Sequence, residues 1–471
     1  MSFNSWTFLV FILVVLPLYH TVSFRWQNRM LLAASCLFYS AWDWRFLILL
    51  VVSTSIDFVV GLKLQQARSS EARKWLLVLS CGANLGILGF FKYFNFFIAN
   101  ATIALAWFGF GVSAAVLDII LPLGISFYTF HSMSYTIDVY RGKMVPIKSF
   151  SSYMLFVLYF PQLVAGPIAR AVALIPQVVA PRSVTRSALI EGLWLALWGL
   201  FKKMVIADNL APVVDATFDL DQAPSGGQCL LALYAFAFQI YCDFSGYTDI
   251  ARGLARLMGF QLALNFALPY MACNPVEFWQ RWHISLSTWF RDYLYIPLGG
   301  NQHGLVKTCR NLLLTMLLGG LWHGASWNFI IWGLYHAVLL VLYRLWATFR
   351  AARGPDAAPR GGGLVSAVIM FHCTCLGWLF FRAASVEQIL NFLVQICTNL
   401  SFNRDAATMI FPVLFFPGIL WAFELWLRNS DDPRLRPGWN CGLGPLTVSV
   451  LMLSIMFLAA GKWQQFIYFQ F

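Results

Sequence analysis

The sequence predicts an all-helical, polytopic membrane protein with roughly a dozen transmembrane helices. Of its 471 residues, 60% are apolar and only 11% are charged, whereas about 25% of the residues of a soluble domain are charged. This composition leaves too little polar surface to coat a soluble particle of this size, and it is too apolar for a disordered chain. The aromatic content of 17% fits side chains that face lipid tails and headgroups. An ordinary soluble enzyme is therefore excluded.

Apolar stretches long enough to cross about 30 Å of hydrocarbon recur from end to end. The expected spans are residues 6–24, 29–42, 45–63, 74–92, 95–121, 122–140, 151–166, 188–206, 227–245, 311–346 as a helical pair, 364–382, 407–427 and 444–468. No basic region or cleavage site surrounds residues 7–19, so they are predicted to be a retained span and not a signal peptide. Gly and Pro interrupt several spans in the middle of the chain, where re-entrant or interfacial helices are expected.

The net charge of +12 is concentrated in short connections between apolar runs. Lys202 and Lys203 are one example. Basic loops of this kind orient helices across a bilayer, so no nucleic-acid partner is expected. Because positive charge follows the first span and does not precede it, we place the N-terminus outside and residues 22–29 and 63–74 in the cytoplasm.

Three polar connectors, residues 208–227, 351–363 and 428–444, are predicted to be loops outside the bilayer. None of them is long enough for a soluble catalytic domain. Nearly all of the ten cysteines lie inside apolar runs, and no Cys-x-x-Cys pair is present. Neither a metal site nor a disulfide framework is therefore expected.

Residues 274–300 interleave charges and aromatic side chains at helical spacing. Trp279, Trp282 and His283 share the predicted aromatic face with Leu286 and aromatic residues further along. Such a helix is expected to lie in the membrane interface or to line a cavity.

Intramembrane histidines are candidates for function, because an imidazole with unpaired nitrogens costs about 2 kcal/mol or more in hydrocarbon. His323 is the strongest candidate, since Gly319, Gly320 and Gly324 surround it. Small residues let helices approach closely or leave space beside a side chain. Two interpretations remain open. In one, the glycines only pack helices and the imidazole bonds a carbonyl group. In the other, the glycines leave space around His323, which then lies in a substrate pocket.

Hydrogen-bonding groups adjoin this imidazole in the sequence. Trp322, Ser326 and Asn328 would combine an apolar wall with a few polar groups, as substrate pockets do. The remaining histidines are expected to have no catalytic role. His131, His336 and His372 are expected to be satisfied core residues, and His20 and His303 to be solvated loop residues.

A second polar cluster is predicted at the end of an apolar helix, in residues 241–249. Asp243, Ser245, Tyr247 and Asp249 would either bind a hydroxylated substrate and orient a histidine, or form a hydrogen-bonded helix terminus. Both interpretations remain open at this point. No G-x-S-x-G elbow or P-loop is present, which leaves histidine-based proton transfer inside the membrane.

Six sequence runs follow one another in order along the middle of the chain. They are PLGISFYTFHSMSYTIDVYRG, FPQLVAGPIAR, FKKMVIADNLA, FQIYCDFSGYTDIARGLARLMGF, FWQRWHISLSTWFRDYLYIPLGGN and LLGGLWHGASWNFIIWGLYH. Together they resemble the membrane-bound O-acyltransferase superfamily. The resemblance is strongest over residues 120–345, and it implies a division of the chain into N-terminal helices at 1–120, a catalytic core at 121–345 and C-terminal helices at 346–471.

The resemblance implies a helical fold around a central funnel or tunnel. It implies that His323, in the W-H-G motif, is catalytic, and that His283 is a second functional position. Trp282 and Arg291 are expected to shape the cavity. His323 would act as a general base, since an imidazole accepts and returns protons near neutral pH.

The resemblance also implies substrates and surroundings. The expected donor is acetyl-CoA or a carrier-protein thioester on the cytoplasmic side, with no bound cofactor. The expected acceptor is an exported polysaccharide, alginate-like, cellulose or another polymer, or an extracytoplasmic partner protein that completes the transfer. The expected location is the bacterial inner membrane, in contact with lipid. The alternative from another class is a transporter or channel that uses the same His and Asp cluster.

Overall fold

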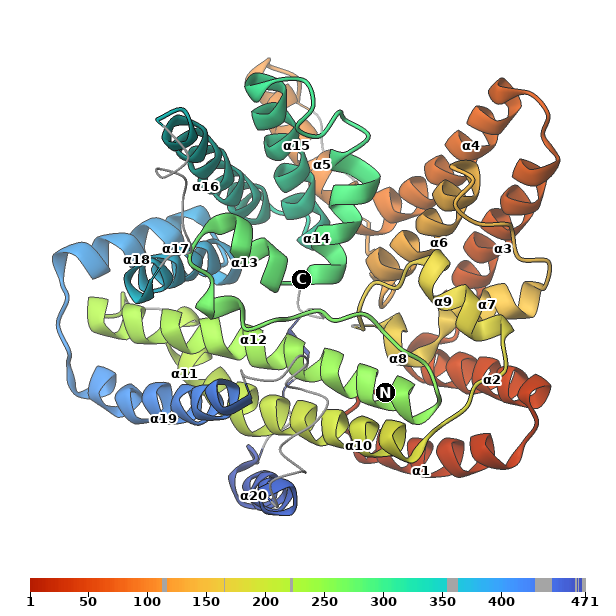
Figure 1. Ribbon diagram of the computed structural model, residues 1–471. Helices are drawn as coiled ribbons and strands as arrows, with labels where there is room; N and C mark the ends of the chain where they lie inside the picture. The colour runs from red at the N-terminus through yellow and green to blue at the C-terminus, as the bar shows by residue number, and fades with distance from the viewer. Residues whose placement is uncertain are drawn as a thin grey trace. The chain divides into compact units, whose positions relative to one another are not determined.

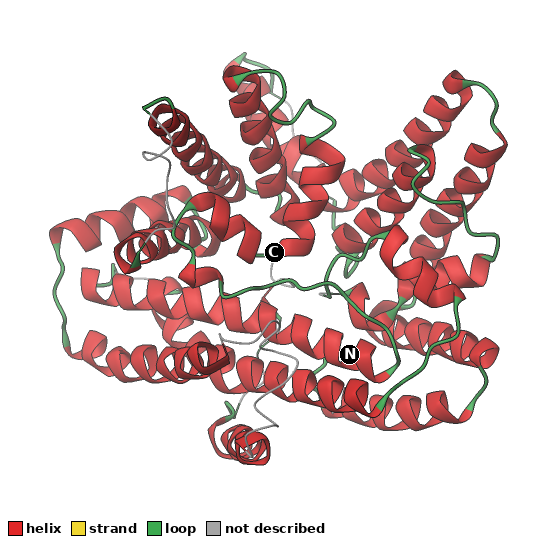
Figure 2. Cartoon of the chain, viewed as in Figure 1, coloured by secondary structure: helices red, strands yellow, loops and turns green. Residues whose placement is uncertain are grey.

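The computed structural model describes residues 1–111, 117–164, 166–220, 223–353, 363–427, 443–461, 464, 466 and 467. These residues form helices and contain no β-strand (Figure 2), so the prediction of an all-helical fold is confirmed. The chain divides into two compact units. One comprises Met1–Leu189 and Leu254–Ala263, and the other comprises Ile190–Gly253 and Leu264–Phe471.

The first unit is built around a buried polar cluster among three helices. Its helices are α1 (Trp6–Thr21), α2 (Phe24–Asp43), α3 (Arg45–Gln66), α4 (Ser70–Leu88), the π-helical η1 (Gly89–Tyr93), α5 (Phe94–Trp107), α6 (Ile125–Tyr140), α7 (Phe150–Leu158), α8 (Phe160–Leu163) and α9 (Ala171–Val179) (Figure 1). The fully buried Asp57 of α3 accepts hydrogen bonds from Ser80 Oγ at 2.5 Å and Asn84 Nδ2 at 2.9 Å, both from α4. Ser80 Oγ also bonds Thr136 of α6 at 3.0 Å, so one network joins the three helices.

The second unit contains most of the predicted site residues. Its helices are α10 (Arg186–Phe201), the π-helical η2 (Lys202–Ala207), α11 (Asp208–Phe218), α12 (Gly226–Leu257), the 3₁₀ turn η3 (Pro269–Met271), α13 (Pro275–Arg281), α14 (Ile284–Phe290), the π-helical η4 (Arg291–Tyr295), α15 (Leu305–His323), α16 (Trp327–Ala351), α17 (Leu364–Arg382), α18 (Val386–Thr398), α19 (Arg404–Leu427) and α20 (Leu443–Leu458). The first residues of α10 and the last turn of α12 belong to the first unit.

Helices α10 and α12 approach closely because glycines face each other between them. A Cβ added to Gly246 would lie 2.7 Å from the carbonyl oxygen of Gly199, and one added to Gly253 would lie 2.6 Å from the carbonyl oxygen of Gly192. Such distances exclude a side chain at either glycine of α12. The contact positions the polar middle of α12 against η2.

Six helices in the described part of the chain are long and apolar enough to cross a membrane. They are Arg45–Gln66, Ser70–Trp107, Gly226–Leu257, Trp327–Ala351, Leu364–Arg382 and Arg404–Leu425. The helical pair predicted at 311–346 and the helix predicted at 364–382 are confirmed.

Two of the wrong predicted boundaries lie in the first unit. The spans expected at 74–92 and 95–121 share one helical run, Ser70–Trp107, because the π-helical turn η1 continues the helix through the Phe-rich sequence between them. The span expected at 151–166 consists of the short helices α7 and α8, which are buried in the first unit.

Candidate active site

The α15–α16 hairpin places His323 at the end of a helix. α15 ends at His323, Gly324 leaves the helix in an extended conformation, and α16 begins at Trp327. The two helices are in near-backbone contact, since a Cβ on Gly320 would lie 2.2 Å from the carbonyl oxygen of Phe329. The C-terminal end of a helix carries partial negative charge, which stabilises a cation by about 0.3–1 kcal/mol. This position therefore favours an imidazolium formed during proton transfer.

The imidazole of His323 is enclosed by aromatic rings. It is 5% exposed, and its ring centroid lies 4.9 Å from that of Trp332, 5.0 Å from that of Trp322 and 5.3 Å from that of Phe381. Trp322 supplies part of this enclosure, but it is not among the residues that line the pocket described next, although it was expected in the pocket wall.

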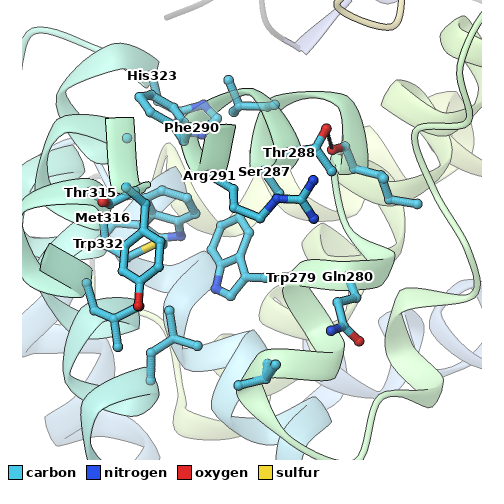
Figure 3. Close-up of a pocket in the computed structure, with 17 residues that line it drawn as sticks. Trp279, Gln280, Ser287, Thr288, Phe290, Arg291, Thr315, Met316, His323 and Trp332 are labelled. Carbon is cyan, nitrogen blue, oxygen red and sulfur yellow. Dashed lines mark hydrogen bonds between the residues drawn. The ribbon is translucent and has the colours of Figure 1, made fainter. Parts of the chain in front are cut away.

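One side of His323 faces a pocket of about 360 Å³, which we call the His323 pocket. Figure 3 shows residues of the hairpin, Thr315, Met316 and Trp332, on one side and residues of α13 and α14, Gln280, Ser287 and Thr288, on the other. The remaining lining residues are Val276, Trp279, Ile284, Leu286, Phe290, Arg291, Tyr295, Leu312, Gly319 and Leu340. The pocket is mostly apolar with a few polar groups, and its size is typical of a small-molecule site.

Two buried hydrogen-bond donors also belong to the wall of this pocket. The indole N–H groups of Trp279 and Trp332 have no hydrogen-bond acceptor among the described residues. Buried donors are nearly always paired in native proteins, so each of these groups calls for a partner such as a water or a ligand. Trp332 was not predicted as a site residue, although its spacing of nine residues from His323 across a Gly-containing turn was visible in the sequence.

The segment predicted as one aromatic helix over 274–300 is broken, and this prediction is wrong. α13 ends at Arg281, His283 adopts the left-handed conformation with φ +42°, and α14 begins at Ile284. The N–H of Ile284 bonds the carbonyl oxygen of Asn265 at 2.9 Å, and the N–H of Ser285 bonds Asn265 Oδ1 at 3.2 Å. A neighbouring segment therefore satisfies amides that a continuous helix would have used. A left-handed non-glycine residue costs about 1–3 kcal/mol and is found most often at functional sites.

His283 is not among the residues that line the His323 pocket. Its ring is fully buried, 6.5 Å from that of His323 and 4.7 Å from that of Phe244 between centroids. His283 lies outside the six candidate spans. Burial lowers its pKa to about 3, so its imidazole is neutral at physiological pH.

The predicted Asp cluster belongs to a second feature, a buried ionic network. Lys202 Nζ lies 2.6 Å from Asp249 Oδ2, and Lys203 Nζ lies 2.8 Å from Asp208 Oδ1 and 2.5 Å from Asp243 Oδ1. Arg252 Nη1 lies 3.4 Å from Asp249 Oδ1, and Lys202 Nζ also donates to Ser245 Oγ at 2.9 Å. We define the ionic network as Lys202, Lys203, Asp208, Asp243, Asp249 and Arg252.

Three predictions about this region are wrong. Asp243 and Asp249 lie inside the continuous helix α12 and not at its end. Asp208 begins helix α11 and is buried, although residues 208–227 were expected to be a loop. Lys202 and Lys203 are buried ion-pair partners and not loop cations. The physical reason is the same in each case, because opposite charges from η2, α11 and α12 compensate one another inside the protein.

The other predicted site residues divide between the pocket and the core. Arg291 lines the His323 pocket and pairs with Asp292 at 2.7 Å. Trp282 packs in the core, with its ring 4.7 Å from that of Trp378. Asn328 donates from Nδ2 to the carbonyl oxygen of Ala383 at 2.6 Å, and Ser326 precedes α16 without a side-chain capping bond.

Tyr247 is buried away from the pocket lining, with its ring 4.5 Å from that of Phe466. The structure thus brings His323, Arg291 and the neighbouring Trp322 together. It places Ser245, Tyr247 and the carboxylates in the ionic network or beside it.

The remaining histidines differ in how their nitrogens are paired. His372 Nε2 lies 2.9 Å from Tyr234 Oη and its Nδ1 lies 2.8 Å from the carbonyl oxygen of Val368, so both nitrogens have partners. The side chain is exposed, so the prediction that His372 is a core residue is wrong about burial. His131 Nε2 accepts from the N–H of Ala169 at 3.2 Å. His336 is fully buried, but neither of its nitrogens has a partner among the described residues. The prediction that His336 is a satisfied core residue is therefore right about burial and wrong about pairing.

The described residues contain no group of three or more His, Cys, Asp or Glu side chains arranged to hold a metal ion.

The loops predicted at 351–363 and 428–444 fall largely outside the described residues.

Comparison with known proteins identifies the family. The profile of the membrane-bound O-acyltransferase family matches residues 139–381, which include His283 and His323. The chain is 43% identical over its whole length to the whole of a probable alginate O-acetylase, AlgI, of Pseudomonas putida. It is 34% identical to a peptidoglycan O-acetyltransferase of Helicobacter pylori, with 94% of this chain and 91% of the relative covered. A teichoic acid D-alanyltransferase of Bacillus subtilis is 29% identical, with 56% and 69% covered. With its helical fold and its apolar helices, this chain belongs to the membrane-bound O-acyltransferase family, and it is an O-acyltransferase of the membrane.

Proposed function

We propose that this protein takes an acetyl group from a cytoplasmic thioester and passes it across the bacterial inner membrane to a hydroxyl group of an exported polysaccharide, directly or through an extracytoplasmic partner protein. The observation that carries the proposal is the position of His323, at the end of a helix and on the wall of an apolar pocket. Membership in a transferase family favours this function over the transporter alternative.

His323 acts as the general base. Its imidazole removes the proton of the acceptor hydroxyl while the hydroxyl oxygen forms a bond to the thioester carbonyl carbon. The tetrahedral intermediate then collapses, the carbon–sulfur bond breaks, and the imidazolium returns the proton to the departing thiolate. The helix end at His323 stabilises the imidazolium in between. The aromatic rings around His323 exclude water, which strengthens these interactions and suppresses hydrolysis of the thioester.

The chemistry of the pocket supports a thioester donor. Acetyl-CoA and acetylated carrier proteins present the thioester on a flexible arm that contains amide groups, and an apolar pocket with a few donors suits such an arm. The indole rings of Trp279 and Trp332 supply apolar wall for such an arm, and the side-chain amide of Gln280 on the same wall supplies a hydrogen-bond donor for its carbonyl oxygens. Arg291, with a side chain that is 58% exposed, supplies a positive charge on the wall.

His283 acts as a positioning residue. Trp322 lies next to both imidazoles, with its ring centroid 6.0 Å from that of His283 and 5.0 Å from that of His323. Because His283 is buried and neutral, it supports the ring that packs on His323 without adding a charge to the site. Its strained backbone fixes where α14, which carries several pocket residues, begins.

The acceptor is proposed from the relatives. Two of them are named for O-acetyl transfer to polymers, alginate and peptidoglycan, and a third is named for a different acyl group on teichoic acid. An alginate-like polysaccharide is the acceptor that the higher identity favours, with cellulose or another exported polymer as the broader class. None of the three polar connectors in the sequence is long enough for a soluble catalytic domain, so a partner protein completes the transfer in this scheme.

The test uses a strain that lacks the gene and carries either the wild-type or the His323→Ala protein. We expect the polymer ester content, measured by NMR of purified polymer, to disappear in the variant while protein abundance and polymer export stay at the wild-type level. Persistent acetylation would refute the role of His323, and a loss of export would favour a transport function.

A further inference from the structure

The three glycines that surround His323 in the sequence differ in what a side chain would meet. A Cβ on Gly320 would lie 2.2 Å from the carbonyl oxygen of Phe329, and a Cβ on Gly324 would lie 2.1 Å from Phe329 Cε2. Both positions are therefore closed by helix packing. A Cβ on Gly319 would have one neighbouring side chain, Phe290, with Cε2 at 3.7 Å, which is an ordinary van der Waals distance.

Packing therefore does not explain glycine at position 319. Glycine in a helix interior costs about 1 kcal/mol relative to alanine, and a methyl group would fit at this position without a clash. Gly319 lines the His323 pocket, and so does Phe290. Because Gly319 has no side chain, open space remains between its backbone and the ring of Phe290.

This opening lies close to the proposed general base. Gly319 and His323 are four residues apart on α15, so they share a helix face and are separated by about 6 Å along the axis. Phe290 ends α14 and is 9% exposed, and its ring packs against that of Trp289 at 5.7 Å between centroids. The ring is thus held in place by its surroundings, as a fixed wall requires.

We infer that Gly319 and Phe290 form a size selector that admits an acetyl group and rejects longer acyl chains. The inference rests on the proposed function, because it assigns the acyl end of the thioester to this part of the pocket. Each added methylene of the acyl chain must fit between the helix backbone at Gly319 and the ring of Phe290. A hydrophobic pocket discriminates by about 10- to 200-fold per methylene.

The test compares acetyl-CoA, propionyl-CoA and butyryl-CoA as donors in membranes that contain the wild-type, Gly319→Ala, Gly319→Val or Phe290→Leu protein. We expect Gly319→Ala to retain acetyl transfer within about threefold and to lower propionyl and butyryl transfer by at least about tenfold. Gly319→Val is expected to block all three donors. Phe290→Leu is expected to raise the butyryl-to-acetyl ratio of kcat/KM by at least about tenfold.

Two glycine controls separate selection from folding. Gly86→Ala changes an exposed glycine of α4 with no atom within 4 Å of its added Cβ, so it should leave transfer unchanged and should not lower thermal stability. Gly320→Ala should lower the amount of folded protein, because its Cβ has no room, and transfer from all three donors should therefore fall equally. An equal change for all three acyl lengths in Gly319→Ala or in Phe290→Leu would overturn the inference, since it would assign the space to the arm of the donor.

A binding measurement separates this inference from the proposed function. Affinities of purified His323→Ala protein, with and without Phe290→Leu, are measured for acetyl- and butyryl-pantetheine by calorimetry. Phe290→Leu should improve butyryl binding relative to acetyl binding by at least about tenfold. An unchanged ratio, or no binding of either thioester, overturns the inference. A wild-type protein that binds the acetyl thioester but transfers nothing to the polymer would contradict the proposed function alone.

Discussion

The His323 pocket and the ionic network place polar side chains among apolar helices in opposite ways. In the ionic network, three cations meet three carboxylates at distances of 2.5–3.4 Å, so each charge is neutralised by its neighbours. In the pocket, His323 and Arg291 border open space instead, among mostly apolar side chains. The difference shows that the polar side chains of one region are compensated by opposite charges whereas those of the other border open space, and that geometry tells these two groups apart.

The largest expected effect tests the pocket. His323→Ala should lower acetyl transfer by about 100- to 10,000-fold, the contribution typical of a positioned general base. Thermal stability should change little, because the pocket already provides space beside the ring. Transfer rates in membranes and unfolding temperatures in detergent are the measurements. The control is His303→Ala, an exposed histidine outside the pocket, which should behave as the wild type.

The next effect tests the ionic network. Lys203→Met should destabilise the fold by about 3–5 kcal/mol, because Asp208 and Asp243 would be left buried without their shared cation. The measurement is the yield of folded protein and its unfolding temperature. Lys307→Met, a change at an exposed lysine of the same unit, is the matched control. If the Lys203→Met protein were stable and had lost only its transfer activity, the ionic network would have to be assigned to the active site.

A third prediction concerns the pH dependence of stability at His283. The pKa of its imidazole is about 3 in the folded protein and about 6.5 in the unfolded chain. Between these values the unfolded chain binds the proton and the folded protein does not, so stability falls as pH falls from 6.5 toward 3. The slope from this group is at most about 1.4 kcal/mol per pH unit.

His283→Asn removes this titration. The unfolding temperature of the variant should therefore decline less steeply than that of the wild type below pH 6.5. Parallel curves for the two proteins would show that His283 is protonated or exposed in the folded state. The comparison also sharpens the difference between a buried positioning histidine and one that faces the pocket.

The smallest expected effect is at Arg291. Its ion pair with Asp292 is solvent-exposed, and such pairs contribute about 0–1 kcal/mol. Arg291→Gln should leave the unfolding temperature unchanged and raise the KM for a thioester donor by up to about fivefold, the equivalent of 1 kcal/mol. Steady-state kinetics at low and high salt provide the measurement. A loss of transfer comparable to that of His323→Ala would make Arg291 a principal determinant of the site.

The sequence predicted some of these features because they depend on local order alone. Apolar runs and the scarcity of charge predicted membrane helices, and the W-H-G motif predicted His323 as the catalytic residue, a role that stays a prediction. The ion pairs were not predictable in the same way, because Lys202 and Lys203 looked like loop cations until α12 supplied Asp243 and Asp249 from 40 or more positions away. The break at His283 was not predictable either. Helical spacing favoured a continuous helix, but Asn265, outside this segment, accepts hydrogen bonds from the amides of Ile284 and Ser285.

By itself, the sequence determined the helical membrane class and selected His323 as the candidate for proton transfer, because hydrophobicity and a short motif are properties of neighbouring residues. Tertiary structure alone decided which polar groups neutralise one another and which face the pocket. Gly319 and Gly320 are adjacent and chemically identical, yet one faces Phe290 across the pocket and the other packs on a carbonyl oxygen. That distinction arises from the rotation of 100° between successive helix positions and from what each direction meets in the folded protein.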